Sequence, residues 1–305
     1  ARQVLERADI GISVISRTER KPCSLPRRAA PLLVTSMDAL PENTGVRAVH
    51  EPEGYVLKVT PRGVIMAGQD PAGVFYGAQT LTQLVEEKDD LRRLRGVTVR
   101  DWPTNRLRGM HMYLPPVENI DFFLRWLDYQ AAIKHNTLIL EIAGGMEFRR
   151  HPEINRAWKS FCHDALTYDA ENDKDVENRR YPLDARVRTG PNALQASRYF
   201  RKNSTHPNVA GGAWLSRAQV ERIADECQKR HVEVIPEVQS LSHCYWLCTA
   251  HPEIAERPIS EDPWPDTYCP SNPRTYELLF DCLEEVLDVF KPRIVHIGHD
   301  EAYTF

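Results

Sequence analysis

Two adjacent carboxylates, Asp300 and Glu301, are the residues of this chain whose types and spacing best suit chemistry. They follow residues 293–297, a mostly apolar and β-branched run that is typical of a buried strand. Barrel and open-sheet folds keep their active sites at the carboxyl ends of their strands. The pair is therefore interpreted as part of an active site, and a solvated acidic turn is the alternative.

The composition limits the classes of partner. The chain has 305 residues, of which 42% are hydrophobic and 27% charged, with a net charge of −4. These values predict a globular protein with ample core and no single-sign surface for nucleic acid or anionic membrane. No apolar stretch reaches the roughly 20 residues that a membrane span needs. We expect no nucleic-acid or membrane partner, and the oligomeric state stays open.

Seven cysteines without a repeating spacing favour reduced thiols over a disulfide framework. Cys244 and Cys248 have a loose metal-type spacing, but no second pair completes it, so buried thiols are the preferred interpretation. Reduced thiols predict a cytoplasmic location. Because position 1 is Ala1 and not Met, a removed leader is also compatible with the sequence.

The first hundred residues predict a small α+β domain over residues 1–102. Residues 54–60 and 63–67 are typical of a β-hairpin. A helix is expected to begin after Asp70, and residues 97–99 are expected to form another strand.

From residue 103 onward the pattern alternates between strands and helices, which predicts an α/β fold with parallel strands. Ser216 and Gln219 form a capping box that starts one helix, and Asn272 starts another. A helix face begins near Ile120. The expected strands are residues 107–112, 137–142, 232–235 (stopped by Pro236) and 293–297.

A long polar segment, residues 167–212, interrupts this alternation. A loop of this length inside a compact domain is usually functional or mobile. It is expected to leave the carboxyl end of the second strand, either as a substrate-covering lid or as a disordered insertion.

Five segments in order resemble glycoside hydrolase family 20, the β-N-acetylhexosaminidases. The segments are residues 73–84, 101–109, 134–136, 234–243 and 296–301. The resemblance implies a (β/α)8 TIM-type barrel after the small domain. Such a barrel takes about 250 residues, yet only four strands fit in residues 103–305, so the chain is expected to hold the first half of the barrel and to be a fragment of a longer polypeptide.

The resemblance implies a retaining exo-glycosidase that removes terminal β-linked N-acetylhexosamine from a glycan or glycoside, with no cofactor. Glu301 would be the general acid and base, and Asp300 would orient the 2-acetamido group of the substrate. Adjacent acids suit this substrate-assisted mechanism because it needs one acid and one orienting group, whereas two carboxyls about 5 Å apart serve a protein nucleophile.

Further site residues follow from the same resemblance. Arg108 matches an arginine that binds sugar hydroxyls, with a rim arginine paired to a carboxylate as the alternative. His243 matches a histidine beside the acid/base residue, with a structural histidine as the alternative. Glu237 is either a site-lining carboxylate or the structural partner of Arg108, and Glu141 is a candidate replacement charge.

The chain departs from the family pattern near these residues. Ile139-Leu140-Glu141 and Gly144-Gly145 stand where the family has a His-rich stretch followed by paired aspartates, so carboxylate support for His243 is missing there. Gln239 replaces an aspartate, and His299 replaces a glycine. These changes put the substrate preference most in question.

Two rival functions remain. The first is a non-catalytic carbohydrate-binding relative, which the altered positions favour and the intact acid pair opposes. The second is a metal hydrolase using His243, His296, His299 and Asp300. Because His296 lies within the expected strand, its convergence with His299 would need a sharp turn, and the sequence predicts no bound metal.

Overall fold

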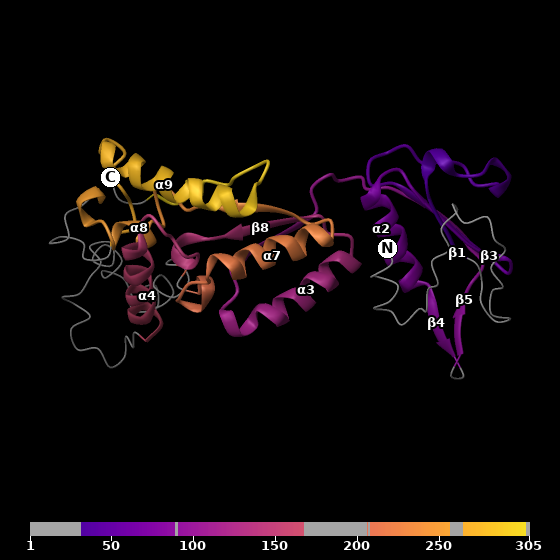
Figure 1. Cartoon of the computed structure of the whole chain (residues 1–305), viewed down its shortest axis with the longest axis horizontal. Helices are drawn as coiled ribbons and strands as arrows, with labels where there is room; N and C mark the ends of the chain where they lie inside the picture. Colours follow the sequence, from indigo (N-terminus) through magenta and orange to yellow (C-terminus); the bar gives the residue numbers. More distant parts are fainter. Residues whose placement is uncertain (1–31, 89–90, 168–205, 207, 257–264, 303–305) are drawn as a thin grey trace, which may run out of the picture. The chain divides into compact units, whose positions relative to one another are not determined.

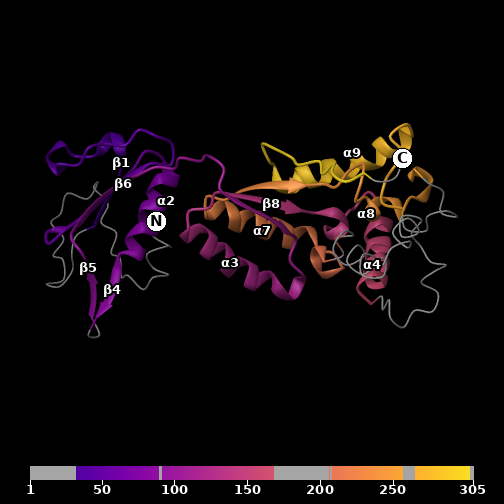
Figure 2. The same cartoon turned by 180° about the vertical axis from the view of Figure 1, so that it is seen from behind.

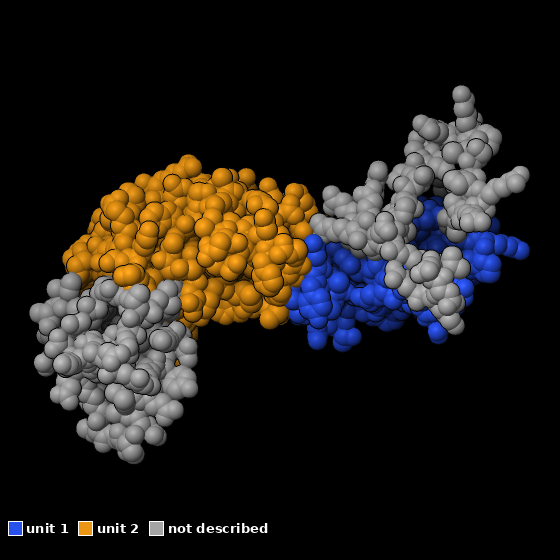
Figure 3. Space-filling model, turned by 90° about the horizontal axis from the view of Figure 1, so that it is seen from below, with its two compact units in different colours: residues 1–108, 128–136 blue, residues 109–127, 137–305 orange. Residues whose placement is uncertain are grey.

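The computed structural model describes residues 32–88, 91–167, 206, 208–256 and 265–302. Its contacts divide the chain into two compact units, which are coloured separately in Figure 3. Unit 1 contains residues 1–108 and 128–136, and unit 2 contains residues 109–127 and 137–305.

Unit 1 contains a four-stranded sheet with the strand order β1-β3-β2-β6. The predicted hairpin is confirmed, because β2 and β3 pair in antiparallel register from Tyr55↔Gly68 to Thr60↔Gly63. The sequence did not predict β1, which pairs in parallel with β3, or the separate β4-β5 hairpin. The strands are β1 (Leu32–Ser36), β2 (Tyr55–Thr60), β3 (Gly63–Gly68), β4 (Val85–Lys88), β5 (Leu91–Leu94) and β6 (Val97–Asp101).

Helix α2 (Pro71–Gln83) packs on this sheet (Figure 1). Its predicted start is confirmed, since the backbone N–H of Gly73 donates to the Asp70 carboxylate at 2.7 Å. Gly77 allows the close approach of helix and sheet, because an added Cβ would lie 2.9 Å from the Met66 sulfur. Buried Phe75 and Leu81 of the helix share one core with strands β2 and β3.

Unit 2 is built on three parallel strands in the order β7-β8-β9. Helices α3, α7 and α9 run alongside β8 in Figures 1 and 2. The strands are β7 (Gly109–Tyr113), β8 (Thr137–Glu141) and β9 (Glu233–Glu237). The helices are α3 (Ile120–Ala132), whose last residues, 128–132, belong to unit 1, α4 (Pro152–Thr167), α7 (Arg217–Lys229), α8 (Tyr245–Cys248) and α9 (Pro273–Phe290).

The predicted helix starts in unit 2 are confirmed. The Ser216 hydroxyl accepts from the Gln219 N–H, and the Gln219 side chain accepts from the Ser216 N–H, which completes the capping box of α7. Asn272 caps α9. Helix α4 was not predicted; it buries Ile154, Trp158 and other residues in the main core.

Two predicted strand boundaries were wrong. Pro236 does not stop the third strand but lies inside β9, paired with Leu140 of β8. The strand continues because the Pro236 carbonyl still accepts a hydrogen bond, from the His296 N–H at 3.0 Å. The fourth predicted strand, residues 293–297, forms only a single parallel bridge, between His296 and Glu237.

Some predictions fall on residues that the structure describes only in part. The segment interpreted as a lid or an insertion, 167–212, lies largely outside the described residues. No disulfide joins the cysteines of the described part, and none of its helices is long and apolar enough to cross a membrane.

Candidate active site

Acidic residues end two neighbouring parallel strands. Glu141 is the last residue of β8 and Glu237 the last residue of β9, and the two are paired in register. Tyr113 ends β7 at the same level. His296 bridges to Glu237 on the other side, so residues 298–301 leave from this same end of the sheet.

Asp300 and Glu301 converge on one imidazole. The Nε2 atom of His243 lies 3.5 Å from Asp300 Oδ2 and 3.5 Å from Glu301 Oε2. His243 is buried, whereas 56% and 54% of the two acidic side chains are exposed. The structure thus brings three predicted site residues together, with both acids open to a ligand.

Backbone strain shapes this turn. His243 and Glu301 each have a φ of 51°. Non-glycine residues rarely adopt positive φ, and those that do are concentrated at functional sites. Gly298 has φ 57°, and an added Cβ there would lie 2.1 Å from the Gln239 side-chain oxygen. The Ser242 hydroxyl donates to the Asp300 carbonyl, which ties the loop after β9 to the acid pair.

His206 supports His243, and the sequence did not predict it. The two rings are stacked, with centroids 4.7 Å apart and an interplanar angle of 13°. Nδ1 of His206 lies 2.9 Å from Glu141 Oε1. Burial lowers the pKa of His206, but the hydrogen bond to Glu141 and the nearby carboxylate charges outweigh it and raise the pKa above its ordinary value. A histidine in a long polar segment carries no pattern that marks it for this position.

Glu141, the candidate replacement charge, is linked to His243 indirectly, through His206. It contacts His206, which in turn stacks on His243. Its own side chain is fully buried.

Glu237 is paired with histidines and not with Arg108. Its carboxylate lies 2.5 Å from His111 Nε2 and 2.9 Å from His296 Nδ1. The predicted alternative of a Glu237–Arg108 pair was wrong. Burial, followed by repulsion from Glu141, raises the pKa of Glu237, and the two histidines oppose this effect. Burial of the Tyr113 side chain, together with the charges of Glu141 and Glu237, raises the pKa of Tyr113 to about 12.

Arg108 lies at the start of strand β7 and is paired with Glu53. It directly precedes β7, at the amino end of that strand, whereas the acids lie at the carboxyl ends. Its guanidinium donates to the Glu53 carboxylate at 2.6 Å and to the carbonyls of Asn105 and Lys134, each at 2.8 Å. The structure thus gives Arg108 the carboxylate-paired alternative, with Glu53 as the partner.

Two substituted positions differ in their placement. Gln239 is buried, and its amide donates to Glu237 at 3.3 Å. His299 is exposed. The ligand set of the rival metal-hydrolase hypothesis, with His296 and His299, is absent from the ligand clusters that the described residues form.

Parallel strands that alternate with helices, with carboxylates at their carboxyl ends, are typical of α/β enzymes whose active sites lie at that end of the sheet. The family model "Glycosyl hydrolase family 20, catalytic domain" matches residues 118–304, and "Glycosyl hydrolase family 20, domain 2" matches residues 9–102. This chain belongs to glycosyl hydrolase family 20.

Several named relatives support this assignment. A β-hexosaminidase of Porphyromonas gingivalis is 26% identical over 270 residues, which cover 82% of this chain and 29% of that protein. One from Vibrio vulnificus is 31% identical over 138 residues, 43% of this chain and 16% of that protein. The chain thus spans less than a third of either relative.

Solved structures support the fold. The β-N-acetylhexosaminidase of Streptomyces coelicolor A3(2) matches with a TM-score of 0.62 at 20% identity, over 90% of this chain and 48% of that one. That of Bacteroides fragilis matches with a TM-score of 0.60 at 20% identity, over 90% and 46%. These likenesses imply a TIM-barrel fold for the catalytic domain.

Proposed function

We propose that this chain carries the acid pair of a retaining exo-glycosidase that removes terminal β-linked N-acetylhexosamine. Glu301 protonates the glycosidic oxygen and then activates water. Asp300 accepts a hydrogen bond from the 2-acetamido N–H and directs the acetamido oxygen to the anomeric carbon. The observation that carries the proposal is the placement of both acids 3.5 Å from His243 Nε2 with more than half of each side chain exposed.

The tandem arrangement favours a nucleophile supplied by the substrate. Two carboxyls that act from opposite sides of a sugar ring lie about 5 Å or more apart, across the substrate. Asp300 and Glu301 are neighbours in sequence and contact the same imidazole, so both approach a sugar from one side of the site. This geometry fits one proton-transferring acid and one orienting acid.

His243 and His206 complete the proposed machinery as positioning residues. His243 contacts the acid pair, and His206 links it to the buried charge of Glu141. The imidazole of His243 fixes the orientation of the Glu301 carboxyl, which must alternate between donating and accepting a proton.

A substrate class follows from the family. Solved relatives include a Vibrio harveyi exo β-N-acetylglucosaminidase in complex with N-acetylglucosamine and a Streptomyces plicatus β-hexosaminidase (D313N) in complex with its product GlcNAc. We infer an N-acetylhexosamine-terminated glycan or glycoside as the substrate here. The three parallel strands and the bridged segment at His296 then correspond to the first four strands of the barrel.

The decisive experiment measures release of the chromophore from an aryl β-N-acetylhexosaminide by the protein in its natural length. Glu301→Gln removes the proton-transferring group and is expected to lower kcat by about 10²–10⁴-fold. Glu284→Gln is the matched control, because Glu284 is similarly exposed and pairs with Arg150 on the surface. Equal background signals from the native protein and Glu301→Gln would overturn the hydrolase assignment.

A further inference from the structure

Histidines and carboxylates form three compact groups among the described residues. The first, His243 with Asp300 and Glu301, is the proposed catalytic site. The other two are His151 with Glu153 and His251, and His111 with Glu141 and Glu237, which we call the strand-end cluster. The ligand atoms of each group lie within 4.8 Å of one another.

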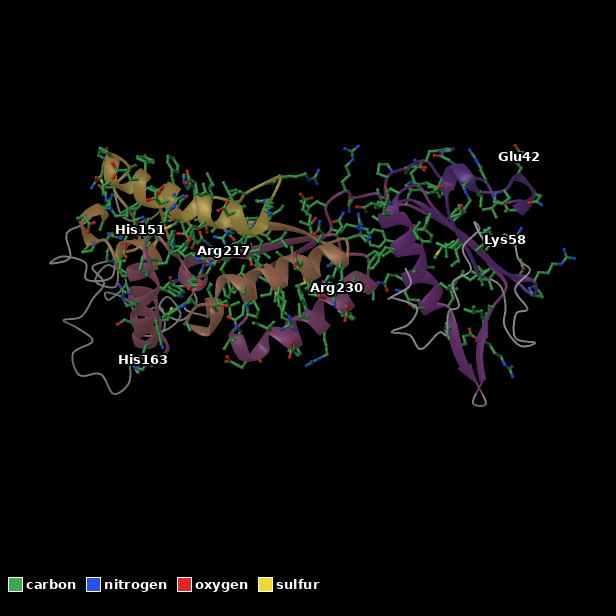
Figure 4. The ribbon with its side chains drawn as sticks, viewed as in Figure 1. Glu42, Lys58, His151, His163, Arg217 and Arg230 are labelled. Atoms are coloured by element: carbon green, nitrogen blue, oxygen red, sulfur yellow. The ribbon has the colours of Figure 1, made fainter. Side chains whose placement is uncertain are left out.

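The group around Glu153 is already satisfied. His151, labelled in Figure 4 near the start of α4, pairs with Glu153 at 3.1 Å and with Asp281 at 3.0 Å. His251 pairs with Glu253 at 3.0 Å and with Glu153 at 3.2 Å. Each imidazole nitrogen has a carboxylate partner, with Glu153 Oε1 shared between the two rings, so ordinary ion pairs explain this group.

The strand-end cluster has a different geometry. It takes one side chain from each parallel strand: His111 from β7, Glu141 from β8 and Glu237 from β9. His111 Nε2 lies 2.5 Å from Glu237 Oε2 and 3.9 Å from Glu141 Oε2. His111 is half exposed, which leaves one side of the cluster open to an incoming ligand.

Glu141 supplies an independent indication of a ligand. Its side chain is completely buried, and its Oε2 atom has no hydrogen-bond partner among the described residues. That oxygen is directed at His111 Nε2, while the other oxygen is held by His206. A buried carboxylate oxygen without a partner loses its hydration without compensation, and a second buried carboxylate, Glu237, lies beside it.

We propose that His111, Glu141 and Glu237 bind a divalent transition-metal ion, with Zn²⁺ as the best match to this ligand set. One imidazole and two carboxylates are typical zinc ligands, at about 2.0–2.2 Å from the ion. Ligand atoms around one tetrahedral ion lie roughly 3–3.6 Å apart. The ion replaces the proton between His111 and Glu237, and the 2.5 Å separation of their atoms opens by roughly 0.5–1.1 Å to reach that spacing.

The ion has a structural role in this proposal. It joins the middle of β7 to the carboxyl ends of β8 and β9 and neutralises the two buried carboxylates beside the proposed catalytic acids. His296 holds the second oxygen of Glu237 at 2.9 Å and so orients that ligand. The site is distinct from the set around His299 that the sequence analysis considered.

The test measures zinc itself. The protein in its natural length is stripped with a chelator, dialysed against Zn²⁺, freed of excess metal and analysed by plasma mass spectrometry and titration calorimetry. We expect one bound equivalent in the native protein and a higher Tm with zinc than without it. Glu141→Gln and Glu237→Gln are expected to lose both the bound equivalent and the zinc-dependent shift.

Two further variants keep the test decisive. His111→Asn changes a half-exposed side chain, so it leaves folding intact by circular dichroism and weakens zinc binding by at least about 10–100-fold. Glu153→Gln, in the satisfied group, retains native binding. A native protein without zinc, or native affinity in folded Glu141→Gln or His111→Asn, would overturn the proposal. No substrate is used, so these outcomes are independent of the hydrolase assignment.

Discussion

Two pairs of carboxylates lie near the carboxyl ends of the parallel strands, and their surroundings are opposite. Glu141 and Glu237 end β8 and β9 and are buried, while Asp300 and Glu301 follow a turn and remain more than half exposed. The buried pair is held by His206, His111 and His296. The exposed pair meets one buried imidazole and leaves its remaining oxygens for a ligand.

This difference in burial indicates different roles for the two pairs: the buried carboxylates stabilise the surrounding histidines, and the exposed carboxylates are free to contact a ligand. A buried carboxylate needs compensating partners, so its position is fixed and its charge serves its neighbours. An exposed carboxylate keeps most of its hydration, so its charge has little desolvation cost, and its oxygens can bind and release a ligand. The variants below test whether the two pairs differ in this way.

The largest expected effect belongs to the exposed pair. In the proposed mechanism Asp300 stabilises the reacting acetamido group, so Asp300→Asn is expected to lower kcat/KM on an aryl β-N-acetylhexosaminide by about 10²–10³-fold. Because the side chain is exposed, the free energy of unfolding changes by less than about 0.5 kcal/mol. Asp121→Asn, another exposed acid, serves as the control. Activity equal to that of the control would remove Asp300 from the mechanism.

The turn that presents the exposed pair is the next most sensitive feature. Gly298→Ala places a Cβ 2.1 Å from the Gln239 oxygen at a φ of 57°, and we expect the unfolding free energy to fall by about 1–3 kcal/mol. The matched control is Gly96→Ala, where the nearest atom is 3.6 Å away. Chemical denaturation of both variants measures the difference. If both lose the same stability, the close packing at Gly298 does not fix the turn.

The free energy of unfolding is expected to depend on pH because His206 pairs with Glu141 of the buried pair. The pKa of His206 is raised in the folded state from 6.5, mainly by Glu141 against the effect of burial. The folded state therefore binds a proton more tightly, and this contribution to stability is complete below pH 6.5 and is lost as pH rises through the folded pKa. Urea denaturation in chelator from pH 6 upward should show declining stability in this window.

The variant His206→Asn isolates that contribution. Its stability should decline less steeply above pH 6.5 than that of the native protein, whereas Glu237, whose pKa is also raised, titrates in both proteins. Parallel pH profiles for the two proteins would contradict the role of the Glu141–His206 contact.

The smallest effect is expected from the satisfied group. Glu153→Gln weakens ion pairs of a side chain that is 38% exposed, so the unfolding free energy should change by less than about 1 kcal/mol. Activity on the aryl substrate should equal that of the native protein. A large loss of activity would show that the difference in burial between Glu141/Glu237 and Asp300/Glu301 does not decide which acids take part in the reaction.

Local sequence patterns predicted much of the fold. The Asp70 cap, the Ser216–Gln219 capping box and the Asn272 cap each involve residues close in sequence, and each was confirmed. Helix α4 was not predicted, because the apolar residues that it buries were not interpreted as one face of a helix. The Pro236 boundary failed because the pairing of β9 depends on a strand 96 residues earlier and a bridge to His296.

The candidate site divides in the same way. Asp300, Glu301 and His243 were named from sequence and lie together. His206 and His111 were missed, and Arg108 is engaged by Glu53. No local pattern reports a partner 55 residues away, as in the Arg108–Glu53 pair.

The sequence by itself determined the tandem acids, the alternation of strands and helices, and the helix caps, because these depend on neighbouring residues and on periodicity. The tertiary structure decided which charges are buried and which histidines meet them. Those contacts join separate strands and loops, and their energies depend on burial, which exists only once the chain has folded.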